Sequence, residues 1–212
     1  MKLDNPAPPN LPLAPDNYER LYIESLTNTL RLYFNRLENI TRNLLSPSGG
    51  RFINLPFGSF YDETDQTAAS TTTAYAITLG NTILANNVSI ENNSEVTFVY
   101  AGVYNIQFSV QLANDDNATQ DIDIWFRKNG VDIASSNSRF GLAPRKSAGD
   151  PYHVIGSLNY VDSFQAGDYV QLYWRTSNTA AYIESYTAPS SPDRPAIPSV
   201  ILTATFVSSV PE

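Results

Sequence analysis

The chain has 212 residues, a formal net charge of −8 and no cysteine, which excludes disulfide bridges, thiolate zinc sites and thiol nucleophiles. Aromatic residues make up 12% of the sequence and charged residues only 16%, a composition typical of a β-rich domain with an uncharged polar surface. Residues 62–212 hold 16 acidic and 7 basic residues, giving −9, so we expect no binding to nucleic acid.

The N-terminal sequence carries no targeting or membrane signal. No apolar stretch reaches the about 18 residues that a bilayer-spanning helix needs, and MKLDNPAPPN lacks the apolar core of a signal peptide. We therefore expect a protein that is made in a cytoplasm and does not insert into a membrane.

Residues 1–15 are rich in proline and are predicted to form an extended arm. Proline lacks an amide donor and holds the backbone near the polyproline II conformation, so this segment does not fold alone. We interpret it as a peptide that anchors on a partner surface, with a disordered terminus as the alternative. The expected anchoring residues are Pro6, Pro8, Pro9, Leu11, Pro12, Leu13 and Pro15.

Residues 16–46 are predicted to form a helix. Asp16 with Glu19 has the spacing of a capping box, and Ser46 with the glycines that follow ends the pattern. Glu38 and Arg42 are spaced for an i,i+4 ion pair. Apolar residues alternate at spacings of three and four, as in a coiled coil, at Ile23, Leu26, Leu30, Tyr33, Leu37, Ile40 and Leu44.

The occupants of this heptad seam favour a trimer. With Ile23 at position a, leucine fills the later a positions and Ile40 a d position, a geometry that disfavours dimers. An amphipathic helix packed on its own domain is the alternative, supported by Tyr22 and Phe34, which lie off the seam. We expect a homotrimer in which the head also associates, since a coil of this length is marginal.

The remainder is predicted to be a linker, residues 47–61, and a mainly β head, residues 62–212. Short alternating segments separated by Asn, Gly, Asp and Pro are typical of an antiparallel sandwich, here a jelly roll. Asn129-Gly130 predicts a type I′ hairpin whose second strand starts at Val131. Strands are expected at residues 74–79, 96–100, 104–112, 122–127, 153–162, 169–175, 182–186 and 200–207.

Three segments resemble the C1q/TNF-like jelly-roll family in order and spacing: AGVYNIQF at 101–108, RKNG at 127–130 and QAGDYVQL at 165–172. The likeness covers about residues 62–207. It implies that three heads pack around a threefold axis, with Tyr104 and Phe108 in a G-x-Y-x-F strand. The last strand, residues 199–207, lacks the Phe-Gly of animal members of the family.

The uncharged polar head, the Pro-rich arm, the helix sequence LRLYFNRLEN and the closing PAIPSVILTATF resemble small virion proteins of bacteriophages. This resemblance implies a location in the virion, as a head fibre, short tail fibre or capsid decoration protein. The arm would then bind another virion protein, in capsid, portal or tail, and the head would face outward towards a host-surface glycan. A purely structural protein that cements capsid or tail subunits is the alternative.

Residues suited to catalysis are sparse, so we expect no enzyme, cofactor or bound metal. His153 is the only histidine, and a structural or interface role is expected for it. The pairs Asp121/Asp123 and Asp115/Asp116 are interpreted as solvated charge, with a polysaccharide depolymerase or a calcium site at Asp115, Asp116 and Asp121 as weaker hypotheses. The outward aromatics expected at a subunit interface, or at a glycan, are Trp125, Tyr169 and Tyr173.

Overall fold

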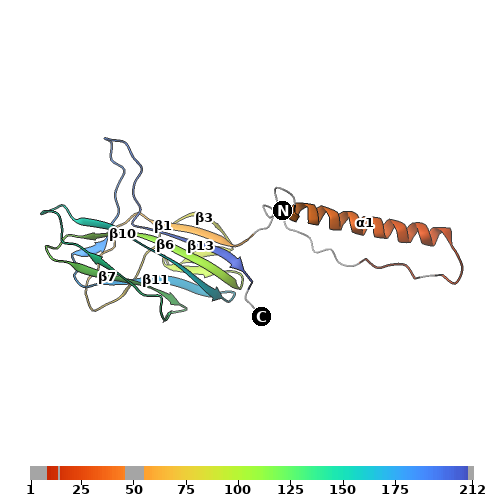
Figure 1. Cartoon of the computed structure of the whole chain (residues 1–212), viewed down its shortest axis with the longest axis horizontal. Coiled ribbons are helices and arrows are strands. Elements are labelled where there is room, and N and C mark those ends of the chain that lie inside the picture. The colour runs from red at the N-terminus through yellow and green to blue at the C-terminus, as the bar shows by residue number, and fades with distance from the viewer. Residues whose placement is uncertain (1–8, 14, 46–54, 210–212) are drawn as a thin grey trace. The chain divides into compact units, whose positions relative to one another are not determined.

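The computed structural model describes residues 9–13, 15–45 and 55–209 and divides the chain into two units, Met1–Leu55 and Pro56–Glu212. The first unit contains the helix and the second the strands (Figure 1). The anchoring residues Pro6 and Pro8, the side chain of Leu44, and the expected end of the helix at Ser46 lie outside the described residues.

The helix α1 spans Arg20–Leu45, which is 26 residues. The expected start at Asp16 is wrong, because Asp16 and Asn17 form a bend and the carbonyl of Glu19 accepts the first helical bond, from Ile23 N at 3.3 Å. Asp and Asn side chains compete for backbone groups and so favour bends over helix interiors. The expected ion pair is confirmed: Arg42 Nη2 lies 2.7 Å from Glu38 Oε1.

The heptad positions of α1 lie on one side of the helix. Most of them are half-buried, while Ile23 is 41% exposed. Large apolar side chains off the seam, Leu32 and Phe34, are half exposed or more. A coiled coil through this seam stays a prediction, since the structure holds a single copy of the chain. No helix among the described residues is long and apolar enough to cross a membrane.

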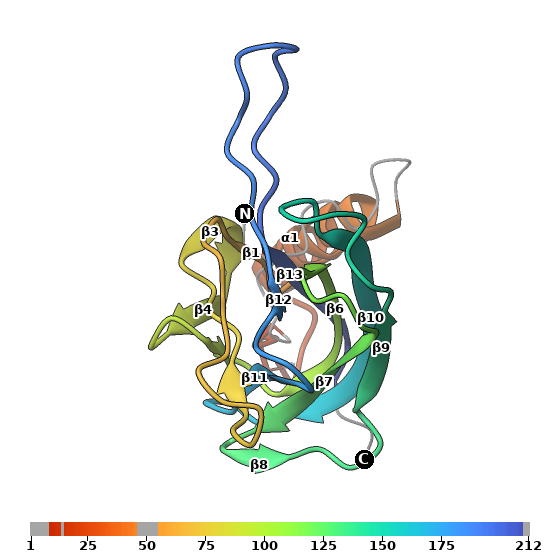
Figure 2. The ribbon, with the colours of Figure 1, turned by 90° about the vertical axis from the view of Figure 1, so that its left-hand side faces the viewer.

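The head is an antiparallel β-sandwich of two sheets, as expected, and its arrangement is compatible with a jelly roll (Figure 2). Within the described residues, sheet A has six strands: β3 (Asn81–Asn86), β1 (Phe57–Asp62), β13 (Val200–Ser208), β6 (Gly102–Asn114), β10 (Tyr152–Phe164) and, beside β6, β12 (Ala181–Ile183). Sheet B has seven: β4 (Val88–Glu91), β5 (Glu95–Phe98), β11 (Tyr169–Thr176), β7 (Gln120–Lys128), β8 (Val131–Asp132), β2 (Tyr75–Ala76) and β9 (Ser138–Leu142).

The core lies between the two sheets and is filled by the inward side chains of alternating strands. The five apolar residues of β6 that the alternation assigned to the core are all buried, and so are those of β7: Tyr104, Ile106, Phe108, Val110, Leu112, Ile122, Ile124 and Phe126. At one end, the rings of Phe98, Tyr104 and Phe164 pack together, with Phe98 centred 4.3 Å from each of the other two.

Several expected boundaries differ from the structure. The strand β1 overlaps the segment expected to be a linker, so the head begins at Pro56, and Phe60 is fully buried in the core. The strands β3, β4 and β9 were not expected, and the strand expected at 182–186 is the shorter β12. The hairpin is confirmed: Asn129 and Gly130 both have positive φ, and β8 starts at Val131.

Candidate functional site

The outward side chains of sheet A form a surface without Asp, Glu, Lys or Arg, which we term the uncharged face. Strand register and the burial of the alternate residues identify its members. They are Phe57, Ser59, Tyr61, Leu84, Asn105, Gln107, Ser109, Gln111, Ile155, Ser157, Asn159, Val161, Ile201, Thr203 and Thr205.

Two properties of the uncharged face are unusual for a surface in contact with water alone. Leu84, Ile155 and Val161 are apolar, yet each exposes more than half of its surface, and the residues around them are neutral and polar. On β6, between Val161 and Thr205, the amide oxygen of Asn105 is buried and has no hydrogen-bond donor among the described residues. A buried acceptor without a donor costs free energy.

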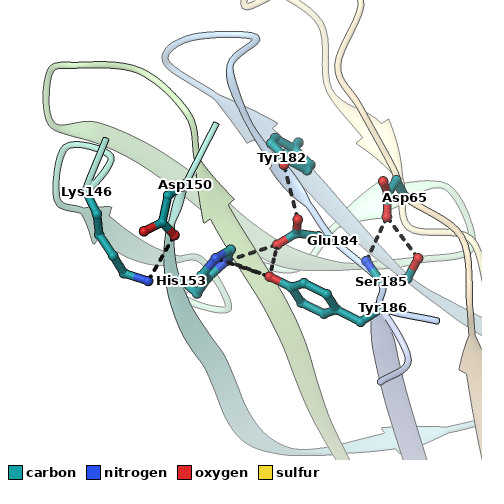
Figure 3. Close-up of polar contacts among 8 residues, drawn as sticks. All are labelled: Asp65, Lys146, Asp150, His153, Tyr182, Glu184, Ser185 and Tyr186. Carbon is teal, nitrogen blue, oxygen red and sulfur yellow. Dashed lines mark hydrogen bonds and ion pairs between the residues drawn. The ribbon is translucent and has the colours of Figure 1, made fainter. Parts of the chain in front are cut away.

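A polar network borders one end of the uncharged face. Ala113 on β6 is flanked by His153 on β10 and Tyr182 on β12. Both side chains contact the carboxylate of Glu184, as Figure 3 shows: Tyr182 donates to Oε1 at 3.3 Å, and His153 Nδ1 lies 2.9 Å from Oε2. Tyr186 donates to the same Oε2 at 2.5 Å. His153 thus lies within this network, in contact with Glu184 and Tyr186.

The tyrosines of the network hold their protons strongly. Burial, followed by the nearby Glu184 carboxylate, raises the pKa of Tyr182 to about 12. The same two causes raise the pKa of Tyr186 further above the ordinary value for a phenol. Both hydroxyls thus remain hydrogen-bond donors to Glu184 at neutral pH, and the arrangement is suited to fixing a segment in place.

The segment that this network fixes is a long loop. Residues 187–196, which we term the projecting loop, leave the head after Tyr186 and return at Ile197. The two residues exchange backbone hydrogen bonds at 2.9 and 2.8 Å. Figures 1 and 2 show the loop, coloured blue, standing out from the sheet A side of the head and away from sheet B.

The aromatic candidates lie on the outward face of sheet B. Trp125 and Tyr173 are directly opposite each other on β7 and β11, with ring centroids 6.2 Å apart. Arg127 covers the ring of Tyr173, its Cζ 3.8 Å from the centroid, and Asp132 Oδ1 accepts from both Trp125 Nε1 and Arg127 Nε. Tyr169 is separate: it lies at the start of β11, where its amide donates to the Asn129 side chain.

Asp123 is not the solvated charge that its outward position suggested. It is buried under two arginines: Arg139 donates to its two oxygens at 2.7 and 3.0 Å, and Arg175 Nε donates to Oδ2 at 2.9 Å. The bond from Arg139, opposed by burial and aided by Arg175, lowers the pKa of the Asp123 carboxyl. On the outward face of sheet B, this carboxylate therefore links β7 to β9 through Arg139 and to β11 through Arg175.

The calcium hypothesis for Asp115, Asp116 and Asp121 finds no geometric support. In the described parts of the chain, no three acidic or histidine side chains are grouped as metal ligands. Asp116 instead accepts from Gln120 and Asn178 at 2.6 and 2.8 Å. Protein donors therefore already occupy Asp116 Oδ2, while Asp115 Oδ1 lies 3.5 Å from Arg145 Nη1.

The described part of the arm includes Pro9, Leu11, Pro12, Leu13 and Pro15. Leu13 is 95% exposed and Leu11 about half exposed, so both side chains are available to a partner. The seam of α1 and these arm residues belong to one unit, and the aromatics of sheet B belong to the other.

Sequence reasoning missed the uncharged face and the projecting loop. The face depends on the strand order β10-β6-β13-β1-β3, which no local pattern reveals. The loop had a usable signal, since prolines recur at every third position: Pro189, Pro192, Pro195 and Pro198. A scan against models of known protein families finds no match, and no curated protein is similar in sequence.

Proposed function

We propose that the chain is a non-enzymatic, homotrimeric structural protein of a bacteriophage particle, a fibre or decoration protein. In this proposal the N-terminal arm attaches to another virion protein, in capsid, portal or tail, and the head faces outward towards a host-surface glycan. Its membership of the C1q/TNF-like jelly-roll class is part of the same proposal.

The observation that carries the proposal is the helix α1. Its unit contains no second helix and no strand among the described residues, so the seam has no folded element of its own unit to cover it. A helix with one apolar side gains most of its stability from packing that side against something else. Heptad spacing makes other copies of α1 the suitable partner.

The head offers a second surface for the same association. The uncharged face combines exposed apolar side chains with neutral polar ones, and it includes the unpaired oxygen of Asn105. Copies of a chain with a net charge of −8 repel one another, and this repulsion is weakest where the approaching surfaces carry no charge. Three copies meeting through the uncharged face would keep the charged face of sheet B outside.

The strand connections support the jelly roll. The chain crosses from sheet A to sheet B and back repeatedly, with β6, β10 and β13 in sheet A and β5, β7 and β11 in sheet B. Sequential strands that lie in opposite sheets are typical of double-sheet jelly rolls built from Greek keys.

The experiment introduces charge into the seam. Leu30→Asp with Leu37→Asp places two carboxylates in apolar layers of every copy and is expected to reduce a trimer to monomers. Asn28→Asp with Asn35→Asp is the matched control, because both residues are exposed on α1 and lie off the seam. Analytical ultracentrifugation should give three times the 23.4 kDa chain mass for the wild type and the control. A wild type that sediments as a single 23.4 kDa species contradicts the proposal.

The cementing role is kept as a second candidate because of Arg127. Its guanidinium covers one face of the Tyr173 ring, so a sugar cannot stack on that face. Glycan arrays and host-adsorption assays with the purified trimer distinguish the two roles. Binding to a glycan or to cells supports the outward-facing role, whereas no binding, together with failure of an arm-deleted chain to join particles, supports cement.

A further inference from the structure

We propose that the projecting loop clasps a second copy of the chain that is docked on the uncharged face. This inference rests on the proposed homotrimer and adds to it a specific contact between copies. The partner is thus another copy of this chain, and the contact is made by residues 187–196.

The position of the projecting loop is the first argument. The segments leading into and out of the loop flank Gln111 of β6, whose carbonyl accepts from Glu184 N and whose amide donates to the carbonyl of Ser199. The loop then extends from the sheet A side of the head in both views (Figures 1 and 2). The uncharged face and the loop therefore adjoin each other, and a copy docked on the face meets the loop at its edge.

The loop is held stiffly at its root. Glu184 is fixed by Tyr182, Tyr186 and His153, as Figure 3 shows. On the other side of the chain, the carboxylate of Asp65 accepts from Ser185 N and Oγ at 2.7 and 2.9 Å. These contacts come from β10, β12 and the segment after β1, so the root is tied to three separate parts of the head.

The loop itself is constrained but contributes little to its own head. Prolines at every third position restrict the backbone and reduce the conformational freedom that would be lost on binding. A backbone bridge joins Ser190 and Asp193 near the tip. Residues 190–195 are nevertheless all exposed. A stiff excursion that does not help to fill the core is typical of a segment that contacts another molecule.

The composition of the loop fits the uncharged face. Residues 187–196 contain one acid, Asp193, and one base, Arg194, so the loop has no net charge. Its remaining residues are Thr, Ala, Ser and Pro, small side chains that can lie on a surface of Ser, Thr, Asn and Gln. A surface with acidic side chains would be a poorer partner, because the neutral loop has no excess of basic side chains to pair with them.

A truncation tests the contribution of the loop. Because Tyr186 and Ile197 already pair through their backbones, an Asn-Gly turn in place of residues 187–196 closes the hairpin without altering the root. The expected result is a folded head, with an unchanged far-ultraviolet circular dichroism spectrum, and a dissociation constant of the trimer raised at least tenfold in sedimentation equilibrium. A second variant replaces the same ten residues by an equally long Gly-Ser segment. It should also weaken the trimer, because it keeps the length of the loop but lacks the side chains that make the contacts.

A cross-linking experiment identifies what the loop contacts. The chain has no cysteine, so Ser191→Cys provides a single site for a benzophenone label. Trimers mixed from labelled chains and isotopically heavy, unlabelled chains should give cross-links from the loop to heavy peptides of β6, β10 or β13. The control label at Ser89→Cys, on the outward face of sheet B, should give no such cross-links.

The possible outcomes distinguish failure of the clasp from failure of the proposed homotrimer. A wild-type trimer whose dissociation constant is unchanged by truncation, or whose loop cross-links only within its own copy or to sheet B, overturns the clasp and leaves the trimer in place. A wild type that is monomeric overturns the trimer and the clasp together.

Discussion

The two outward faces of the sandwich share one backbone geometry and differ in chemistry. The outward face of sheet A has no charged residue in its strands, and one of its buried acceptors lacks a donor. The outward face of sheet B satisfies its own charges, as in the group of Asp123, Arg139 and Arg175. A face whose charged groups already pair with one another gains little from a partner. The uncharged face, by contrast, can be covered by a partner without the burial of any charge.

The largest effect should come from placing charge on the uncharged face. Gln107 is exposed in the middle of β6, and Gln107→Lys would bury an unpaired ammonium in any contact between copies. A cost of about 3 kcal/mol corresponds to a roughly hundredfold weaker trimer. Thr97→Lys, at an outward position of β5 in sheet B, is the control. Equal weakening by both variants, measured by sedimentation equilibrium, would remove the distinction between the two faces.

The next effect concerns the stability of sheet B. Asp123→Asn removes the charge that pairs with two arginines and should lower the free energy of unfolding by about 2 kcal/mol, because the half-exposed guanidinium groups are partly solvated. The control Asp121→Asn should change it by less than about 0.5 kcal/mol, since Asp121 is partly exposed and 4.0 Å from Arg139. Urea unfolding measures both, and equal losses would contradict the assignment.

The same carboxyl sets a pH dependence. Its pKa is lower in the folded chain than in the unfolded chain, so its contribution is present above the ordinary aspartate pKa of about 3.9 and is lost as the pH falls through the lowered value. The difference in stability between wild type and Asp123→Asn should therefore shrink in acid. A difference that stays constant down to the lowest pH at which the head is folded would argue against this charge effect.

A smaller effect is expected at the aromatic pair. Trp125→Ala removes the ring opposite Tyr173 and the bond to Asp132, and should cost about 1–2 kcal/mol of folding stability. The mass of the assembly should not change, because this residue lies on sheet B. Dissociation of the trimer by Trp125→Ala, with the head still folded, would instead identify sheet B as the subunit interface.

The smallest effect concerns the root of the projecting loop at high pH. A phenol whose pKa is raised stabilises the fold below its unfolded pKa of about 10, and this contribution is lost as the pH rises towards the folded value of about 12 for Tyr182. Tyr182→Phe should therefore lessen the fall in stability at alkaline pH. Tyrosinate absorption of the folded wild type should show one class of late-ionising phenol that is reduced in the variant; an unchanged titration would contradict the network.

Local sequence patterns predicted those parts of the head in which residues alternate for many positions. The strands β6 and β7 show this, with inward residues such as Phe108 and Phe126 that the structure buries. In the strand β3, Thr82 is followed by three consecutive apolar residues, Ile83–Ala85, so the sequence shows no alternation of apolar and polar residues there. The strand β1 is short, and Gly58 interrupts its alternation, so the sequence alone predicts a linker there.

The candidate sites were predictable only where neighbours in sequence are also neighbours in space. Trp125 and Tyr173 were identified singly from their outward positions, but their contact requires the register of β7 with β11. Asp123 has partners 16 and 52 residues away, at Arg139 and Arg175, and its burial depends on both. The heptad seam was visible because it lies within one helix.

The placement of β1 has a mechanical consequence. The chain enters the head at Pro56, whose carbonyl accepts from Phe206 N, and β1 then runs to Asp62, whose carbonyl accepts from Ser199 N at the end where the projecting loop arises. Along its length β1 is paired with β13 on one edge and β3 on the other. A pull between Pro56 and the opposite end of the head therefore strains these two ladders in shear, with many bonds sharing the tension, instead of peeling them apart one bond after another.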